Sequence, residues 1–335
     1  MGIESTTRQR EQNVSTSVMQ LWRNHRISRM IRGSGVLGAL IILVVVGAII
    51  SPYFIRTGNL INVIRQIAIV GIMGVGMTFV ILTSGIDLSV GAIVGFVSVI
   101  SAGLMRDGAP WPVAVVAGLI AGGFVGALNG FGITKGNLQP FIMTLGMMVI
   151  ARGVSMLISD GQPISIRGDA GDSFEWLGAG DWLGIPVPVW LLVGIALASW
   201  LTLTYTTFGR QIYAVGDNAE AARLSGINVN LVIFGVYVIS GVLSAVSALI
   251  LVSRLTTGHP DQGTGFELDA IAIVVIGGTS LFGGEGGVSG TLIGAAIVAV
   301  LSNLLNLVGV SPFSQQIVQG LIILGAVLLE RRKAE

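Results

Sequence analysis

Long apolar runs, separated by short polar or glycine-rich breaks, recur along the chain from residue 36 to residue 330. A helix that crosses a membrane needs about 20 consecutive apolar residues, and runs of roughly this length follow one another along the sequence. The breaks at 83–87 and 283–287 are only a few residues long. The pattern predicts an all-α integral membrane protein with about ten transmembrane helices. The predicted spans are 36–54, 60–82, 88–105, 112–133, 138–158, 187–205, 230–252, 267–282, 288–308 and 313–330.

The composition supports a membrane protein and excludes several other classes. Hydrophobic residues make up 53% of the chain and charged residues only 10%, whereas a soluble domain has about 25% charged residues to cover its surface. The net charge of +1 gives no electrostatic reason to bind nucleic acid. Cysteine is absent and the two histidines, His25 and His259, lie far apart, so disulfides are excluded and a histidine-rich metal site is not expected.

Basic residues are distributed unevenly between the two sides that ten spans would create. The N-terminal tail holds six arginines, and the chain ends in Arg331, Arg332 and Lys333. Lysine and arginine collect on the cytoplasmic side of membrane proteins, so both termini are expected in the cytoplasm, which requires an even number of spans. Ten spans place twelve basic residues inside and four outside. The predicted organisation is a cytoplasmic tail (1–35), a single transmembrane domain (36–330) and a cytoplasmic C-terminus (331–335).

The loop at 159–186, external in this topology, is rich in acids and tryptophans. Tryptophans collect at the membrane–water interface, so the loop either lies in that interface or forms a docking surface for a partner. The sequence leaves both interpretations open. The candidate docking residues are Asp169, Asp172, Glu175, Trp176 and Trp182.

The loop at 206–229, internal in this topology, predicts a short capped helix from Asn218 to Ser225. Asn218 suits the N-cap position, Glu220 suits the first turn, and Gly226 stands where a helix would end. Connections in helix bundles are usually only a few residues long, so a purely structural linker does not need such an element. We expect something outside the membrane to bind it.

The chain lacks the residues that would let it hydrolyse a nucleotide. A phosphate-binding loop needs a lysine that follows glycine, but Lys135 follows threonine and Lys333 follows arginine. Ionisable residues inside the spans are also few, and Arg152 is the clearest of them. Because ion-driven carriers usually keep such residues within the membrane, the sequence favours a passive path whose energy comes from elsewhere. It predicts no enzyme and no cofactor in this chain.

The break at 83–87 has two interpretations. In the first, it is a tight turn at the membrane face, and Asp87 caps the next helix by accepting backbone N–H bonds. In the second, it interrupts a helix inside the membrane, where non-helical backbone is tolerated if it lines a cavity. The turn is favoured for Asp87 alone. Thr279 and Ser280, before the glycines at 283–287, look like a second version of the same break.

Three stretches identify a family. They are VGMTFVILTSGIDLSVG (75–91), RLSGINV (223–229) and GFELDAIAIVVIGGTS (265–280). In these stretches the chain resembles the permease subunits of bacterial ABC sugar importers of the ribose type, and the resemblance extends from about residue 55 to 331. It implies a permease homodimer in the bacterial inner membrane, a cytoplasmic ABC ATPase that holds ATP and Mg²⁺, and a periplasmic sugar-binding protein.

The resemblance also gives roles to particular residues. The segment EAARLSG (220–226) looks like the coupling motif that docks into the ATPase, so we expect coupling through Asn218, Glu220, Ala221, Ala222, Leu224 and Gly226. A sugar needs a path that offers some hydrogen bonds, and the candidates for its lining are Thr83, Ser84, Asp87, Asn129, Asn303 and Asn306. The alternative for each is an interhelical contact, typically worth about 0.6 kcal/mol.

Three functions fit the sequence. The importer permease for a monosaccharide leads. An ion-coupled secondary carrier is the first alternative, and a permease of the related branched-chain amino acid group, which shares the architecture, is the second. The ribose-like stretches favour a sugar over an amino acid.

Overall fold

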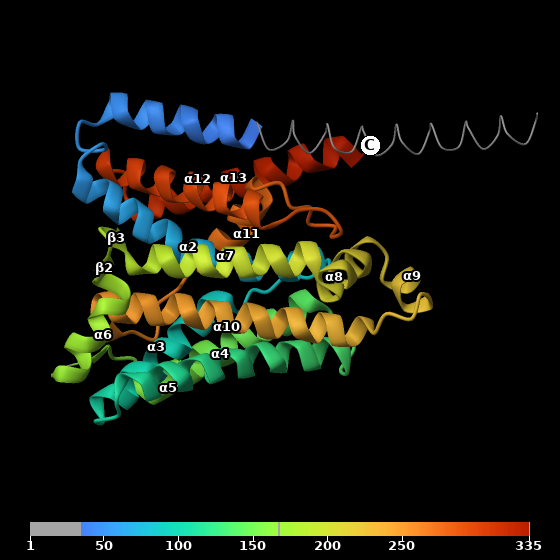
Figure 1. Cartoon of the computed structure of the whole chain (residues 1–335), viewed down its shortest axis with the longest axis horizontal. Coiled ribbons are helices and arrows are strands. Elements are labelled where there is room, and N and C mark those ends of the chain that lie inside the picture. The colour runs from blue at the N-terminus through green and yellow to red at the C-terminus, as the bar shows by residue number, and fades with distance from the viewer. Residues whose placement is uncertain (1–34, 167, 335) are drawn as a thin grey trace, which may run out of the picture.

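The computed structural model describes residues 35–166 and 168–334. Within them the molecule is almost entirely helical, and most helices run along its long axis (Figure 1). The first helix, described over Gly35–Ile50, precedes α2 (Thr57–Leu82), α3 (Val90–Arg106), α4 (Trp111–Thr134), α5 (Pro140–Ser159), α6 (Asp169–Ala179), α7 (Val187–Tyr205), α8 (Thr207–Asp217), α9 (Ala219–Leu224), α10 (Val229–Leu255), α11 (Phe266–Ile276), α12 (Val288–Leu307) and α13 (Pro312–Ala334).

In the described residues, four two-residue strands form two small antiparallel pairs. β1 (Ile164–Ser165) pairs with β4 (Thr257–Gly258), and β2 (Asp181–Trp182) pairs with β3 (Ile185–Pro186). The β2–β3 pair lies with α6 at one end of the bundle, and α8 and α9 project at the other (Figure 1). We call these the α6 end and the α9 end.

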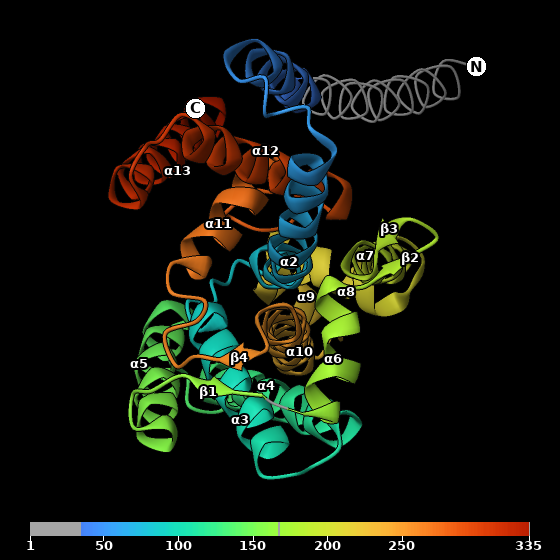
Figure 2. The same ribbon diagram turned by 90° about the vertical axis from the view of Figure 1, so that its left-hand side faces the viewer.

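Helices α2 and α10 form the centre of the bundle, as the view from the α6 end shows (Figure 2). In the most apolar stretch of each helix, 78% of the α2 residues and 61% of the α10 residues are buried, against 28% for α4 and 22% for α5. The outer helices keep large apolar side chains exposed, such as Ile120 on α4 and Val149 on α5. An apolar outer surface of this extent suits a hydrocarbon solvent and not water.

Six described helices are long and apolar enough to cross a membrane, namely α2, α4, α5, α7, α10 and α12. Two shorter apolar helices are Gly35–Ile50 and α3. A helix begins near each of the ten predicted spans, yet the length criterion supports six, so the count of ten stays a prediction. The predicted tail lies outside the described residues except for Gly35.

The eighth predicted span, 267–282, is wrong in length. Helix α11 has only 11 residues and ends at Ile276. The backbone N–H of Gly278 bonds to Val275 and that of Thr279 bonds to Val274, a pattern that closes a helix C-terminus. The second break therefore runs from 277 to 287 and is longer than the five residues that the sequence indicated.

Candidate functional site

The first break, between α2 and α3, is organised around the carboxylate of Asp87. This side chain is fully buried. Its Oδ1 accepts hydrogen bonds from the backbone N–H of Ser89 at 3.0 Å and from the Ser89 hydroxyl at 2.6 Å, and its Oδ2 accepts one from the Ser240 hydroxyl at 2.8 Å. Of the predicted cap one backbone bond is present, from the N–H of Ser89, which is the N-cap residue of α3. Asn129 extends the cluster by donating to the Ser89 hydroxyl at 2.8 Å.

Most of this break is buried between helices, and Ser84 is its exposed residue. The carbonyl oxygen of Ile86 accepts hydrogen bonds from Tyr237 on α10 and Thr144 on α5, each at 3.2 Å. Ser240 is eleven residues from the start of α10 at Val229, which places it about 16 Å along that helix at 1.5 Å per residue. On α5, however, Thr144 is only four residues from the helix start at Pro140. The break is thus packed among other helices, and its place at the membrane face or inside the membrane stays a prediction.

The second break lies directly against the first. The backbone N–H of Gly284 donates to the carbonyl oxygen of Leu82 at 3.1 Å. The hydroxyl of Ser84 lies 2.7 Å from the carbonyl oxygen of Phe282. Two segments about 200 residues apart in the sequence thus hydrogen-bond to each other where their helices are interrupted.

Helix α8 is attached to both breaks. The Ser84 hydroxyl also lies 3.1 Å from the carbonyl oxygen of Gly216, so its one proton is shared between two acceptors. The hydroxyl of Tyr213 donates to the carbonyl oxygen of Gly286 at 3.0 Å. A Cβ at Gly216 would overlap the carbonyl oxygen of Leu82, so the close approach of α8 to the first break requires glycine here. A movement of α8 would reach both breaks through these contacts.

The predicted capped helix is confirmed as α9. The Asn218 side chain accepts a hydrogen bond from the backbone N–H of Ala221 at 2.9 Å, and Gly226 follows the helix with a φ of +85° that other residues adopt only with strain. Glu220 pairs with Arg223 at 2.9 Å on the exposed face. These local contacts fix the shape of the element. Its coupling role stays a prediction.

One residue of this helix differs from the expected docking face. Ala222 is only 4% exposed and belongs to the core beneath α9, together with Val229 and Val232. It therefore holds α9 to the bundle and cannot enter a partner's groove. Leu224 is 82% exposed, and Ala221 is also exposed, so these two residues carry the accessible apolar surface of α9.

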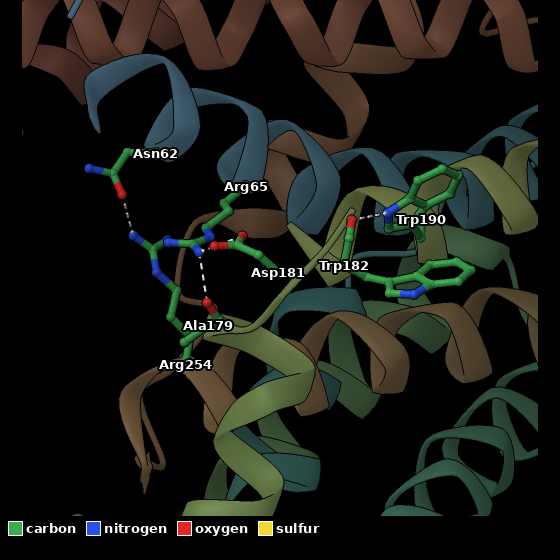
Figure 3. Close-up of polar contacts among 7 residues, drawn as sticks. All are labelled: Asn62, Arg65, Ala179, Asp181, Trp182, Trp190 and Arg254. Carbon is green, nitrogen blue, oxygen red and sulfur yellow. Dashed lines mark hydrogen bonds and ion pairs between the residues drawn. The ribbon is translucent and has the colours of Figure 1, made fainter. Parts of the chain in front are cut away.

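At the α6 end, an acid of the loop at 159–186 that is not among the predicted docking residues is engaged within the chain (Figure 3). Asp181 forms an ion pair with Arg65 of α2 at 3.2 Å, and Arg65 also donates to the carbonyl oxygen of Ala179 at 2.7 Å. Close by, the ring of Trp190 contacts Trp182 edge-on at 5.3 Å and donates to its carbonyl oxygen. These contacts tie the loop at 159–186 to α2 and α7.

The predicted docking residues are accessible where their side chains are described. Asp172, Glu175, Trp176 and Trp182 are exposed. The backbone of Asp169 begins α6, and its side chain lies outside the described part. The structure thus supplies an exposed surface at the α6 end without identifying what binds there.

The six predicted path residues do not converge on one place. Thr83, Ser84, Asp87 and Asn129 lie at the first break, and the Thr83 hydroxyl bonds to the carbonyl oxygen of Val80. Asn303 instead exchanges hydrogen bonds with Asn59 near the start of α2. Asn306 accepts one from Gln315 of α13. These two asparagines join helices at the α6 end.

The sequence analysis did not predict helices α8 and α6. It therefore also missed the contacts of Tyr213 and Gly216 with the breaks and the helix that holds the loop at 159–186 against the bundle. A signal for α8 was present, because Thr206 caps it by accepting from Gly209 N–H. Buried Ile212 and Val215 repeat at helical spacing. For α6, the Ser253 hydroxyl of α10 hydrogen-bonds to the backbone of Phe174 and Gly178. No local sequence pattern predicts a contact between segments this far apart.

Comparison with known proteins shows which family and which permeases the chain is similar to. Residues 59–327 match the family described as "Branched-chain amino acid transport system / permease component". The chain is 46% identical over 296 residues to the ribose import permease protein RbsC of Escherichia coli K12, which covers 88% of this chain and 92% of that protein. It is 48% identical over 295 residues to RbsC of Bacillus subtilis 168, covering 88% and 91%. The D-allose transport system permease protein AlsC of Escherichia coli K12 is 39% identical over 294 residues, covering 87% and 89%. No solved structure matches the chain.

Proposed function

This chain belongs to the permease-component family of branched-chain amino acid transport systems, and from that premise we propose that it is the membrane-spanning subunit of an ABC importer that carries a monosaccharide into the cytoplasm. The observation that carries the proposal is the alignment with ribose import permeases, at 46% and 48% identity, over 88% of the chain. The relatives named for allose and arabinose are 39% and 38% identical over similar lengths. A pentose or hexose is therefore the proposed cargo.

The two alternatives from the sequence have less support. The family description names branched-chain amino acids, but the similar permeases are named for the sugars ribose, D-allose and L-arabinose. An ion-coupled carrier would need ionisable groups free to bind the ion. Arg152 instead donates to the carbonyl oxygen of Pro260 at 3.1 Å, and Asp87 accepts three hydrogen bonds. Arg152 and Asp87 thus have structural partners, whereas Oε2 of Glu267 has none among the described residues.

The proposed assembly is a homodimer of this permease in the bacterial inner membrane, surrounded by lipid, with no nucleic acid partner. A separate cytoplasmic ABC ATPase holds ATP and Mg²⁺, and a periplasmic binding protein delivers the sugar. The chain itself uses no cofactor. In this arrangement it has ten spans, the α9 end and both termini face the cytoplasm, and the α6 end faces the periplasm. The uneven distribution of basic residues, twelve inside and four outside, supports this orientation.

Energy enters through α9 in this proposal. The ATPase binds the exposed face of α9, and its movement passes to α8, which follows α7 directly and is bonded to both breaks through Gly216 and Tyr213. Helix interruptions are natural places for such a movement to change the bundle, because their backbone is held by a few specific hydrogen bonds. The Asp87 cluster fixes the shape of the first break.

Reconstitution distinguishes the three functions. The permease, its ATPase and a ribose-loaded binding protein are placed in liposomes, and uptake of labelled ribose is measured with and without ATP inside. Uptake that needs both ATP and the binding protein is the expected result. Uptake by the permease alone under a proton or sodium gradient would establish a carrier instead. ATP-dependent uptake of leucine without uptake of ribose would establish an amino acid permease.

A further inference from the structure

Ser84 occupies a position that helices usually give to glycine. Beyond the end of α2, the backbone N–H of Gly85 bonds to the carbonyl oxygen of Val80 at 3.1 Å, and that of Ser84 bonds to the carbonyl oxygen of Ile81 at 2.9 Å. This pair of bonds is the Schellman closure of a helix, in which the residue after the C-cap is left-handed. Ser84 is that residue, with a φ of +61°. Glycine adopts this conformation without strain and serine does not, so the side chain of Ser84 calls for a functional explanation.

The hydroxyl of Ser84 reaches two other segments of the chain. It lies 2.7 Å from the carbonyl oxygen of Phe282 in the second break and 3.1 Å from that of Gly216 in α8. Gly216 is in the last turn of α8, where carbonyl groups have no partner further along the helix, so Ser84 supplies a donor there. Gly283 leaves room for this contact, because a Cβ at Gly283 would overlap the hydroxyl oxygen of Ser84.

Each pair of these three segments is joined by a hydrogen bond. The N–H of Gly284 in the second break donates to the carbonyl oxygen of Leu82, at the end of α2. Tyr213 of α8 donates to the carbonyl oxygen of Gly286 in the second break. Ser84 joins the first break to α8 and adds a second bond between the breaks. Packing alone transmits a push, whereas a hydrogen bond also resists separation, so the three segments form a closed junction.

The Ser84 side chain contributes more to this junction than to folding. Ser84 is exposed, and a hydrogen bond that water can replace adds little to stability. If the residue only closed α2, glycine would do so without strain, and water would solvate the carbonyl groups. What serine adds to the helix end, and glycine lacks, is the connection between the segments.

We propose that Ser84 is the positioning residue that makes the two breaks move together with α9. Asn218 is both the C-cap of α8 and the N-cap of α9, so no flexible linker separates the two helices. A displacement of α9 therefore moves Gly216, and the Ser84 hydroxyl passes the movement to the first break, which holds the Asp87 cluster. The proposal rests on the proposed import function and names the residue through which the ATPase acts on the first break.

The first test replaces Ser84 by glycine, which relieves the left-handed strain and removes the hydroxyl. Asn137→Gly is the matched control, because Asn137 is also exposed, has a φ of +50° and lies in the turn between α4 and α5. In liposomes with the ATPase and loaded binding protein, the sugar imported per ATP hydrolysed should fall about two- to tenfold for Ser84→Gly, the effect of one or two hydrogen bonds. Its melting temperature and its co-purification with the ATPase should equal those of Asn137→Gly.

Two results of this test would overturn the proposal. Equal import per ATP for Ser84→Gly and Asn137→Gly would show that the hydroxyl has no part in coupling. A fall in import together with a fall in melting temperature would make Ser84 a structural cap and not a positioning residue.

The second test follows the backbone directly. Deuterium exchange at 83–89 and at 277–287 is compared in the assembled importer with and without a non-hydrolysable ATP analogue. In the wild type and in Asn137→Gly, exchange in both segments should differ between the two states. In Ser84→Gly the difference at 83–89 should shrink about twofold or more. The difference at 277–287 should remain, because Tyr213 still joins α8 to the second break.

The outcomes of the exchange test separate this proposal from the proposed function. An undiminished difference at 83–89 in Ser84→Gly would overturn the proposal. So would a wild-type importer that takes up sugar without any nucleotide-dependent exchange at the two breaks. If wild-type liposomes show no ATP-dependent sugar uptake, the proposed function itself fails.

Discussion

The backbone N–H of Gly284 donates a hydrogen bond to the carbonyl oxygen of Leu82 at 3.1 Å, and this contact joins the two interrupted helices of the bundle. Leu82 ends α2, so its carbonyl has no partner further along its own helix. The second break satisfies it. Gly216 of α8 lies against the same carbonyl, which makes this point the meeting place of both breaks and the segment that leads to α9.

Replacing Gly216 by alanine should weaken the packing of α8 against the carbonyl group of Leu82. The new Cβ overlaps the Leu82 carbonyl oxygen, and forcing an extra methyl into a close-packed contact costs about 1–3 kcal/mol. The purified permease should unfold at lower temperature, and ATP-driven uptake should fall about tenfold if 1.4 kcal/mol of this cost appears in the rate-limiting step. Gly153→Ala on α5 is the matched control, because a Cβ there meets no atom within 4 Å. Equal melting temperatures and uptake for the two variants would contradict the role of the contact.

The two substitutions Asp87→Ala and Asp87→Asn should differ in effect. Alanine leaves the buried N–H of Ser89 and the hydroxyls of Ser89 and Ser240 without their acceptor, and each stranded buried group costs roughly 1–3 kcal/mol. Asparagine keeps one oxygen for Ser89 and donates to the Ser240 oxygen, so it should retain most of the stability. The measurement is thermal unfolding in detergent. If Asp87→Asn keeps both stability and uptake, the carboxylate charge has no part in transport. If it keeps stability but loses uptake, Asp87 serves the path as well as the fold.

Local signals in the sequence were sufficient for α9 and insufficient for the breaks. Asn218 and Gly226 mark a helix start and end by chemistry within a few residues, so the element could be predicted. The packing of the first break depends on Tyr237 and Thr144, which come from other helices. Hydropathy places an apolar run in a membrane but carries no information on such cross-helix partners. Asn303 illustrates the same limit, because its partner Asn59 is 244 residues away.

Neutralising the exposed acids of α6, in the double variant Asp172→Asn and Glu175→Gln, should reduce uptake when the binding protein is scarce. Both side chains are exposed at the α6 end, and charges at the rim of an interface mainly affect association rate and salt dependence. The apparent KM for loaded binding protein should rise, and the slope of uptake against ionic strength should become shallower. Asp107→Asn is the control: Asp107 is exposed at the same end, and the hydrogen bond from Arg106 lowers the pKa of its carboxyl, so it too is charged. A double variant with unaltered KM and salt slope would remove these acids from docking.

The last prediction concerns Leu224, which combines an apolar side chain with 82% exposure on a helix that projects from the bundle. Replacement by aspartate should abolish binding to the ATPase, because a charge would be desolvated in an apolar groove.

Ala222→Asp is unsuitable for this purpose, since Ala222 is buried and its replacement would unfold α9. Lys135→Asp adds an acid at an exposed position between α4 and α5 on the same end and serves as the control. The measurement is co-purification with the ATPase, followed by sugar-stimulated ATP hydrolysis in liposomes. Leu224→Asp should lose both while retaining the wild-type melting temperature, because its side chain contributes little to the core. Gly226→Val should give a related loss by a different route, since valine at a φ of +85° strains the turn that orients α9. A Leu224→Asp permease that still binds the ATPase and imports sugar at the wild-type rate would show that energy enters elsewhere.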